Sequence, residues 1–148
     1  MIKSFPMLAA ALMMLPFAGQ AQPLLTASGH STWTIFVKVA GAPPCQCIQL
    51  LRFHADGTVD GPANDRFSGA ALGEWKRSGD NAISLALVQN TIDADGNAAG
   101  VFMIRGTMIL DATGDSASGS TTFDVLDSGG KPVFSGVATF TGIRLKPL

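Results

Sequence analysis

Short runs in which apolar and polar residues alternate fill most of the chain, and turn sequences separate them. Residues 56–57, 95–96, 114–115 and 129–130 read Asp-Gly, Asp-Gly, Gly-Asp and Gly-Gly. Such pairs between apolar, β-branched runs are typical of tight turns that join neighbouring antiparallel strands. The pattern therefore predicts an antiparallel meander over residues 31–145.

Seven segments have the length and composition of strands. They are 33–39, 47–54, 73–77, 82–92, 100–110, 119–126 and 133–145, and Gly136 divides the last into two possible halves. Gly106 suggests a kink or bulge, and the stretch 60–71, with Pro62, is the longest expected irregular connection. A long meander without helices must hide its edges, and closure is the simplest way to do so. We expect an all-β fold, a single antiparallel up-and-down β-barrel of seven or eight strands.

The first 21 residues have the features of a secretory signal peptide. Lys3 supplies a positive charge, residues 5–17 are apolar, and residues 18–21 offer the small side chains of a cleavage site. The apolar stretch is too short to span a bilayer, and no later segment reaches that length. We expect residues 22–148 to form one domain, secreted or periplasmic, without a membrane span.

The charge balance argues against a nucleic-acid partner. The chain has 10 basic and 11 acidic residues and a net charge of −1. Nucleic-acid binding needs clustered positive charge to neutralise phosphates. Tyrosine is absent, so the aromatic platform of single-strand binders is thin as well. The sequence does not determine the oligomeric state.

Three segments carry a resemblance to a known group of proteins. Residues 53–59, 73–79 and 136–145 hold strand and turn signatures similar to those of the calycin or lipocalin-like small barrels of secreted bacterial proteins. Most of that group has no assigned function. The resemblance implies a lipocalin-like barrel for residues 22–148, and it implies no chemistry, because function lies in a site grafted on a fold.

Lipocalins also have a Gly-x-Trp in an early strand and a late arginine that covers the tryptophan. In this chain Trp33 lies in the first expected strand and Arg144 in the last, whereas the Gly-x-Trp sequence, 73–75, lies mid-chain. The resemblance implies that Arg144 stacks on Trp33 and closes the barrel, a cation–π contact of about 0.5 to 2 kcal/mol.

The leading functional hypothesis is that the barrel interior binds a small apolar molecule, with no cofactor. The expected wall consists of large side chains from all parts of the meander: Phe36, Phe53, Trp75, Phe102, Met103, Arg105, Met108, Phe123, Phe134 and Phe140. Arg105 points inward in one register, where Asp124 or an acidic ligand could pair with its charge, and outward in the other. The apolar set Phe102, Ile104, Met108 and Leu110 favours the outward register for Arg105.

Two other functions stay open. An isomerase or cyclase could fold an apolar substrate in the barrel pocket, by analogy of fold with allene oxide cyclase-like barrels, using Arg105, Glu74 or His54. Alternatively, the barrel is filled by its own side chains, because eight strands leave just enough width for them. A filled barrel would serve as a surface or protein-interaction module.

Cys45 and Cys47 are the only cysteines. In an oxidising compartment two cysteines are expected to pair. Alternate residues of a strand lie about 6.5 to 7 Å apart, at the limit of disulfide geometry, so a bridge needs a bend at Pro43-Pro44. The alternatives are two thiols, a redox function, or a copper or zinc site with His30 or His54. We expect no metal, because the spacing lacks the Cys-x2-Cys pairs of structural zinc.

Overall fold

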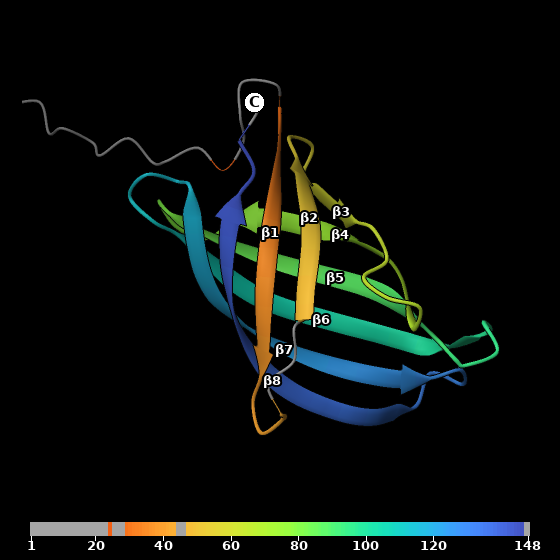
Figure 1. Ribbon diagram of the computed structural model, residues 1–148. Coiled ribbons are helices and arrows are strands. Elements are labelled where there is room, and N and C mark those ends of the chain that lie inside the picture. The colour runs from red at the N-terminus through yellow and green to blue at the C-terminus, as the bar shows by residue number, and fades with distance from the viewer. Residues whose placement is uncertain (1–23, 25–28, 44–46, 147–148) are drawn as a thin grey trace, which may run out of the picture.

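The computed structural model describes residues 24, 29–43 and 47–146, which form a closed barrel of antiparallel strands (Figure 1). Each strand pairs with the next, and the last pairs with the first. The strands are β1 (His30–Val39), β2 (Cys47–His54), β3 (Thr58–Gly61), β4 (Ser68–Arg77), β5 (Ala82–Ile92), β6 (Ala98–Leu110), β7 (Ser116–Asp127) and β8 (Pro132–Arg144). The expected all-β, up-and-down, lipocalin-like barrel is confirmed, with eight strands. The expected signal peptide, residues 1–21, lies outside the described residues.

The eighth strand is not the one that the sequence suggests. Gly136 does not divide the last strand, because β8 runs without a break from Pro132 to Arg144. Instead, the short strand β3 pairs with β2 on one side and with β4 on the other. The expected irregular stretch 60–71 is therefore wrong at both ends: it begins with the end of β3 and overlaps the first residues of β4.

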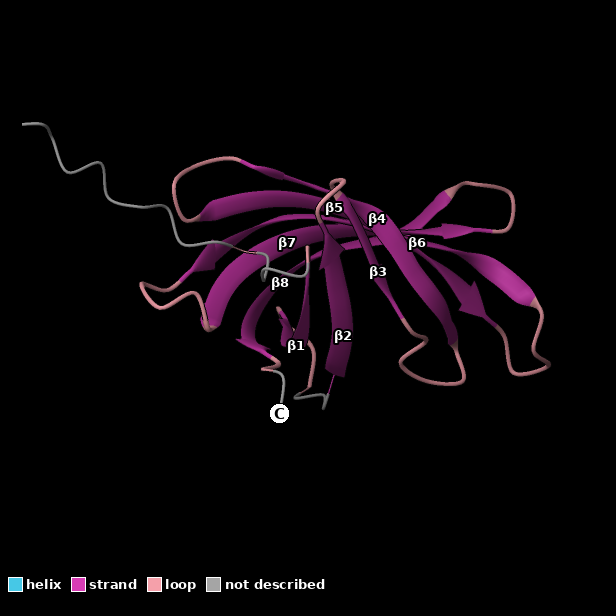
Figure 2. Cartoon of the chain, turned by 90° about the horizontal axis from the view of Figure 1, so that it is seen from above, coloured by secondary structure: helices cyan, strands magenta, loops and turns pink. Residues whose placement is uncertain are grey.

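The glycines inside the strands make room for their neighbours. The pairing of β6 continues through Gly106 without a shift in register, so the expected bulge there is wrong. A Cβ atom at Gly106 would lie 2.4 Å from the carbonyl oxygen of Ser120, and one at Gly136 would lie 2.5 Å from the ring of Phe123. These positions need glycine because the adjoining backbone or ring occupies the space of a side chain. Strands β7 and β8 are strongly curved in both views (Figures 1 and 2).

One end of the barrel is filled by its core. The side chains buried there include Leu24, Trp33, Phe53, Ile83 and Leu110. Trp33 pairs with Arg144 across β1 and β8, and the guanidinium carbon lies 5.2 Å from the centre of the indole. Arg144 also donates a hydrogen bond of 3.0 Å to the carbonyl oxygen of Leu24. These contacts connect Leu24 and the last strand to the filled end.

The turn between β6 and β7, at the same end, is organised by Asp111. Its carboxylate accepts hydrogen bonds from the Ser116 hydroxyl at 2.7 Å, the Thr113 hydroxyl at 2.9 Å and the Asp115 amide at 3.1 Å. The Ser116 hydroxyl above all holds the pKa of Asp111 well below its ordinary value of 3.8. The pKa values of Asp56 and Asp93 are lowered by similar bonds in their own turns, from Thr58 and from the Asn97 amide respectively.

These aspartates predict a loss of stability in acid. Because their pKa values are lower in the folded chain, their contribution is complete above the ordinary pKa of 3.8 and disappears as the pH falls through the folded values. We expect the free energy of unfolding, measured with urea at a series of pH values, to decrease below about pH 4. The Asp111→Asn variant should have a lower free energy of unfolding than the wild type at neutral pH. Its free energy of unfolding should also decrease less when the pH is lowered. If the free energy of unfolding depends on pH in the same way in both proteins, Asp111 does not contribute to the loss of stability in acid.

None of the described residues belongs to a helix with the length and apolar character needed to cross a membrane.

An apolar cavity as candidate functional site

The other half of the barrel contains a cavity of about 490 Å³. This volume lies within the range of small-molecule sites, about 300 to 1,000 Å³. Exposed residues of the β3–β4 connection, among them Asn64 and Phe67, line its edge, so the cavity reaches the surface there. The apolar side chains of its wall are Ile35, Val37, Val39, Ile48, Leu51, Leu85, Leu87, Phe102, Ile104, Met108, Phe123, Ala138 and Phe140.

The period of two along each strand determines which side chains reach this cavity. On β5 the side chains of Leu85, Leu87 and Gln89 line the cavity, whereas Val88 is exposed on the outer face. Toward the end of the strand Asn90 and Thr91 line the cavity as well. On β6 the even-numbered residues Phe102 and Ile104 line the cavity in the same way. The same inward face continues toward the filled end, so a strand such as β5 supplies both the core, with Ile83, and the cavity wall.

Aromatic rings form one side of the site. The rings of Phe102 and Phe123 are stacked with their centres 5.0 Å apart, and Phe134 lies 5.7 Å from Phe123. Phe134 is 58% exposed, so the series of rings leads from the cavity to the surface. The three rings, joined by these two contacts, give a broad apolar face suited to a chain or a ring.

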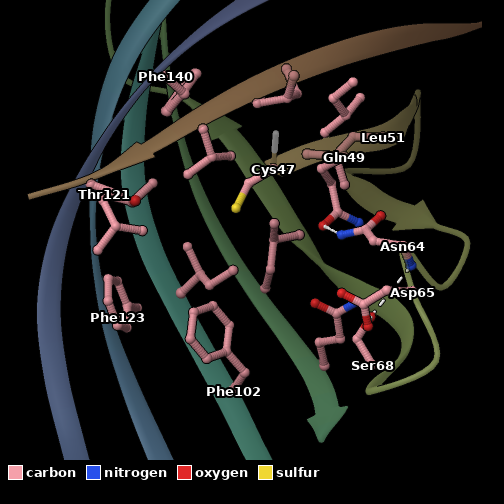
Figure 3. Close-up of a pocket in the computed structure, with 18 of the residues that line it drawn as sticks. Cys47, Gln49, Leu51, Asn64, Asp65, Ser68, Phe102, Thr121, Phe123 and Phe140 are labelled. Atoms are coloured by element: carbon pink, nitrogen blue, oxygen red, sulfur yellow. Dashed lines mark hydrogen bonds between the residues drawn. The ribbon is translucent and has the colours of Figure 1, made fainter. Parts of the chain in front are cut away.

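Polar side chains gather on the opposite side, on β2, β5 and the β3–β4 connection (Figure 3). Gln49 is 9% exposed, and its Oε1 accepts a hydrogen bond from Asn64 Nδ2. Its Nε2 is buried and has no hydrogen-bond partner among the described residues. Gln89 is also buried, and its Nε2 donates to the carbonyl oxygen of Gly69 at 2.6 Å.

Asp65 carries the charge of this polar side. Its Oδ1 accepts hydrogen bonds from the Phe67 amide at 2.8 Å and from the Ser68 hydroxyl at 3.1 Å. Among the described residues that line the cavity, Asp65 alone has a formal charge at neutral pH. The site therefore combines an apolar wall, a group of uncharged amides and one exposed carboxylate.

Four of the ten expected wall residues line this cavity: Phe102, Met108, Phe123 and Phe140. Phe53 and Trp75 are in the filled end instead, where their rings meet edge to face at 6.2 Å. Trp75 Nε1 donates to the carbonyl oxygen of His54 at 2.9 Å. These two rings contribute to the core, because inward-facing residues of one strand lie at either end of the barrel, according to their position along the strand.

The other four expected residues are placed on the outer face or at the rim. Phe36 on β1 and Met103 and Arg105 on β6 occupy the outward positions of the alternation, and Phe134 lies at the exposed end of the ring series. Arg105 is mostly exposed, and its Nη1 lies 3.9 Å from Asp124 Oδ2. Arg105 therefore has its partner on the neighbouring strand β7, outside the barrel.

The two buried glutamines, Gln49 and Gln89, are not among the residues expected to form the wall. Gln49 precedes the inward-facing Leu51 by two residues, and Gln89 follows the inward-facing Leu87 by two. The alternation alone would have placed both side chains inside, since β2 and β5 were predicted with their observed bounds. Asn64 lacked such a signal because it lies in an irregular connection.

The residues considered for catalysis or metal binding do not gather in the cavity. Glu74 is exposed on the outer face of β4, and His54 Nε2 pairs with Asp60 Oδ2. Cys47 lines the cavity and is disulfide-bonded. Cys45 lies outside the described residues, so the pairing of these two cysteines stays a prediction. Within the described residues, no three acidic, histidine or cysteine side chains are grouped to hold a metal ion.

Fold and site together define a class: an eight-stranded up-and-down barrel, filled at one end and hollow at the other. The chain matches no family model, no curated protein and no solved structure.

Proposed function

We propose that this protein is an exported binding protein that holds a small, mainly apolar molecule in the hollow half of its barrel. The observation that carries the proposal is the cavity of about 490 Å³ with its wall of aliphatic and aromatic side chains. Removing apolar ligand surface from water stabilises a complex by about 25 cal/mol per Å². A cavity of this size could enclose most of a drug-sized ligand.

The nature of the polar groups favours binding over catalysis. Gln49 and Gln89 present carboxamides, which do not exchange protons as general acids or bases do. The candidates for such a role lie elsewhere: Glu74 is exposed on the outer face of β4. His54 pairs with Asp60, and Arg105 pairs with Asp124. The isomerase or cyclase alternative would therefore depend on Asp65, the one carboxylate among the described lining residues, which lies at the exposed edge with its Oδ1 bound to the Phe67 amide and the Ser68 hydroxyl. The cavity itself favours a carrier over a filled interaction module.

Export to the periplasm or beyond is the second part of the proposal. It is supported by the charge, the apolar run and the small residues of positions 1–21. The test is the N-terminal sequence of the protein recovered from the cell envelope or medium of its host. A chain that begins at Gln22 supports export, and an intact N-terminus on a cytoplasmic protein contradicts it.

Binding can be tested with N-phenylnaphthylamine, an uncharged fluorophore whose emission rises in apolar surroundings. We expect its fluorescence to rise saturably with the purified wild-type protein at a stoichiometry of one. A linear response at all concentrations would contradict the proposed function.

A further inference from the structure

The two sides of the cavity differ in chemistry, and the difference bears on the kind of ligand. Phe102, Phe123 and Thr121 lie on one side, and Gln49 and Asn64 face them from the other (Figure 3). A purely apolar molecule would leave the polar side without a partner. An amphiphilic molecule would match both sides, so the inference below rests on the proposed function and specifies its ligand.

Gln49 has an unmet hydrogen-bonding group. Its Oε1 is taken by Asn64, whereas its Nε2 lies buried near Gly61 and has no partner among the described residues. Buried amide groups nearly always have a partner, so such a donor needs an explanation. The last torsion of a glutamine is soft, so the carboxamide can turn until Nε2 faces the cavity, and this turn gives up the bond from Asn64 to Oε1. An oxygen acceptor on a ligand at this place would complete its hydrogen bonding.

The charges around the cavity restrict the head group. Asp65 is the one charged residue among the described lining residues, and the guanidinium of the neighbouring Arg66 lies over the Phe67 ring at 4.5 Å, at the rim. A carboxylate or phosphate head would be desolvated beside Asp65 without a cation in the wall to pair with it. An ammonium head has donors but no acceptor, so it cannot serve Gln49 Nε2.

We propose that the cavity selects a neutral amphiphile: an apolar chain or ring against Phe102 and Phe123, with one uncharged hydroxyl or carbonyl oxygen held by Gln49. Without a ligand, Asn64 holds the Gln49 carboxamide by donating to its Oε1, and on binding the carboxamide turns so that its Nε2 donates to the ligand oxygen. The selectivity comes from the combination of a donor without a partner and a wall whose described residues include no cation.

Three probes with the same chain test this selectivity: decanol, decanoate and decylammonium. Each displaces N-phenylnaphthylamine from the wild-type protein at neutral pH, and the displacement gives its dissociation constant. We expect decanol to bind about tenfold or more tightly than decanoate, the difference that one well-placed hydrogen bond and one unpaired charge produce. Decylammonium should also bind more weakly than decanol.

The variants locate the head group. Gln49→Leu should lower the affinity for decanol about tenfold. It should leave the affinity for N-phenylnaphthylamine unchanged, because this fluorophore has no oxygen that accepts a hydrogen bond from Gln49. Thr121→Val is the matched control: it removes a hydroxyl from the aromatic side of the same cavity and should leave decanol binding as in the wild type. Gln49→Glu keeps an acceptor for Asn64 and adds a charge, so it should prefer decylammonium to decanol.

The outcomes separate this inference from the proposed function. Saturable binding of the fluorophore with equal affinities for decanol and decanoate, or with equal decanol affinities for the wild type and Gln49→Leu, overturns the head-group assignment alone. Should Gln49→Leu not fold, a Gln49→Glu variant that still prefers decanol overturns it. Absence of any saturable binding overturns both.

Discussion

Ala138→Phe is expected to weaken binding of N-phenylnaphthylamine about a hundredfold while the barrel stays folded. Ala138 is 3% exposed and lines the cavity from β8, between Val39 on β1 and Thr121 on β7. A phenyl ring added there occupies the volume that a ligand would fill. Losing the burial of a group of that size costs about 2 to 3 kcal/mol, which corresponds to a factor of about one hundred. Fluorescence titration measures the loss, and circular dichroism checks the fold.

Ala86→Phe is the matched control for this substitution. Ala86 lies on β5 between Leu85 and Leu87, and its side chain is exposed on the outer face. The added ring should therefore leave the affinity unchanged. Equal losses in both variants, or an unchanged affinity in Ala138→Phe, would place the ligand outside the cavity.

Trp33→Ala is expected to destabilise the protein by about 3 to 5 kcal/mol. Trp33 is fully buried in the filled end, its Nε1 donates to the Ser31 hydroxyl at 3.0 Å, and Arg144 lies over its ring. Truncation opens a cavity at the centre of this core and removes the surface on which Arg144 rests. The change in the free energy of unfolding is measured by urea denaturation, because the slope shows whether unfolding stays two-state.

Phe36→Ala on the same strand is the comparison. Phe36 is 41% exposed on the outer face of β1, so its truncation should cost less than about 1 kcal/mol. Similar costs for the two variants would mean that the end closed by Trp33 is not the stabilising core of the barrel.

Turn chemistry made most of the fold predictable. The observed bounds of β2 and β5 agree with the expected ones, and the other five expected strands overlap their counterparts, because Asp-Gly and Gly-Gly pairs mark strand ends locally. Strand β3 could not be found in this way. Of its four residues Thr58 and Val59 are typical strand formers, and Asp60 and Gly61 are not. This segment is a strand because β2 and β4 flank it, which is a tertiary effect.

The site was less predictable than the fold. Alternation identifies the inward residues of β6, and thus Phe102 and Met108. It does not tell which end of the barrel is filled, since Phe53 and Phe123 both face inward but lie in core and cavity wall respectively. That division depends on how all eight strands stack their side chains together. Gln49 was not predictable for a different reason: its side-chain amide has neither a charge nor a nucleophilic group that would mark it in the sequence as functional.

The most direct test of the central claim is a crystal structure of the protein grown with bromodecanol, with the bromine located by its anomalous scattering. We expect a bromine peak inside the barrel, against Phe102 and Phe123, with the hydroxyl near Gln49. A barrel whose cavity is closed by its own side chains, or a peak confined to the outer face, would contradict the claim that the hollow half of this barrel is a binding site.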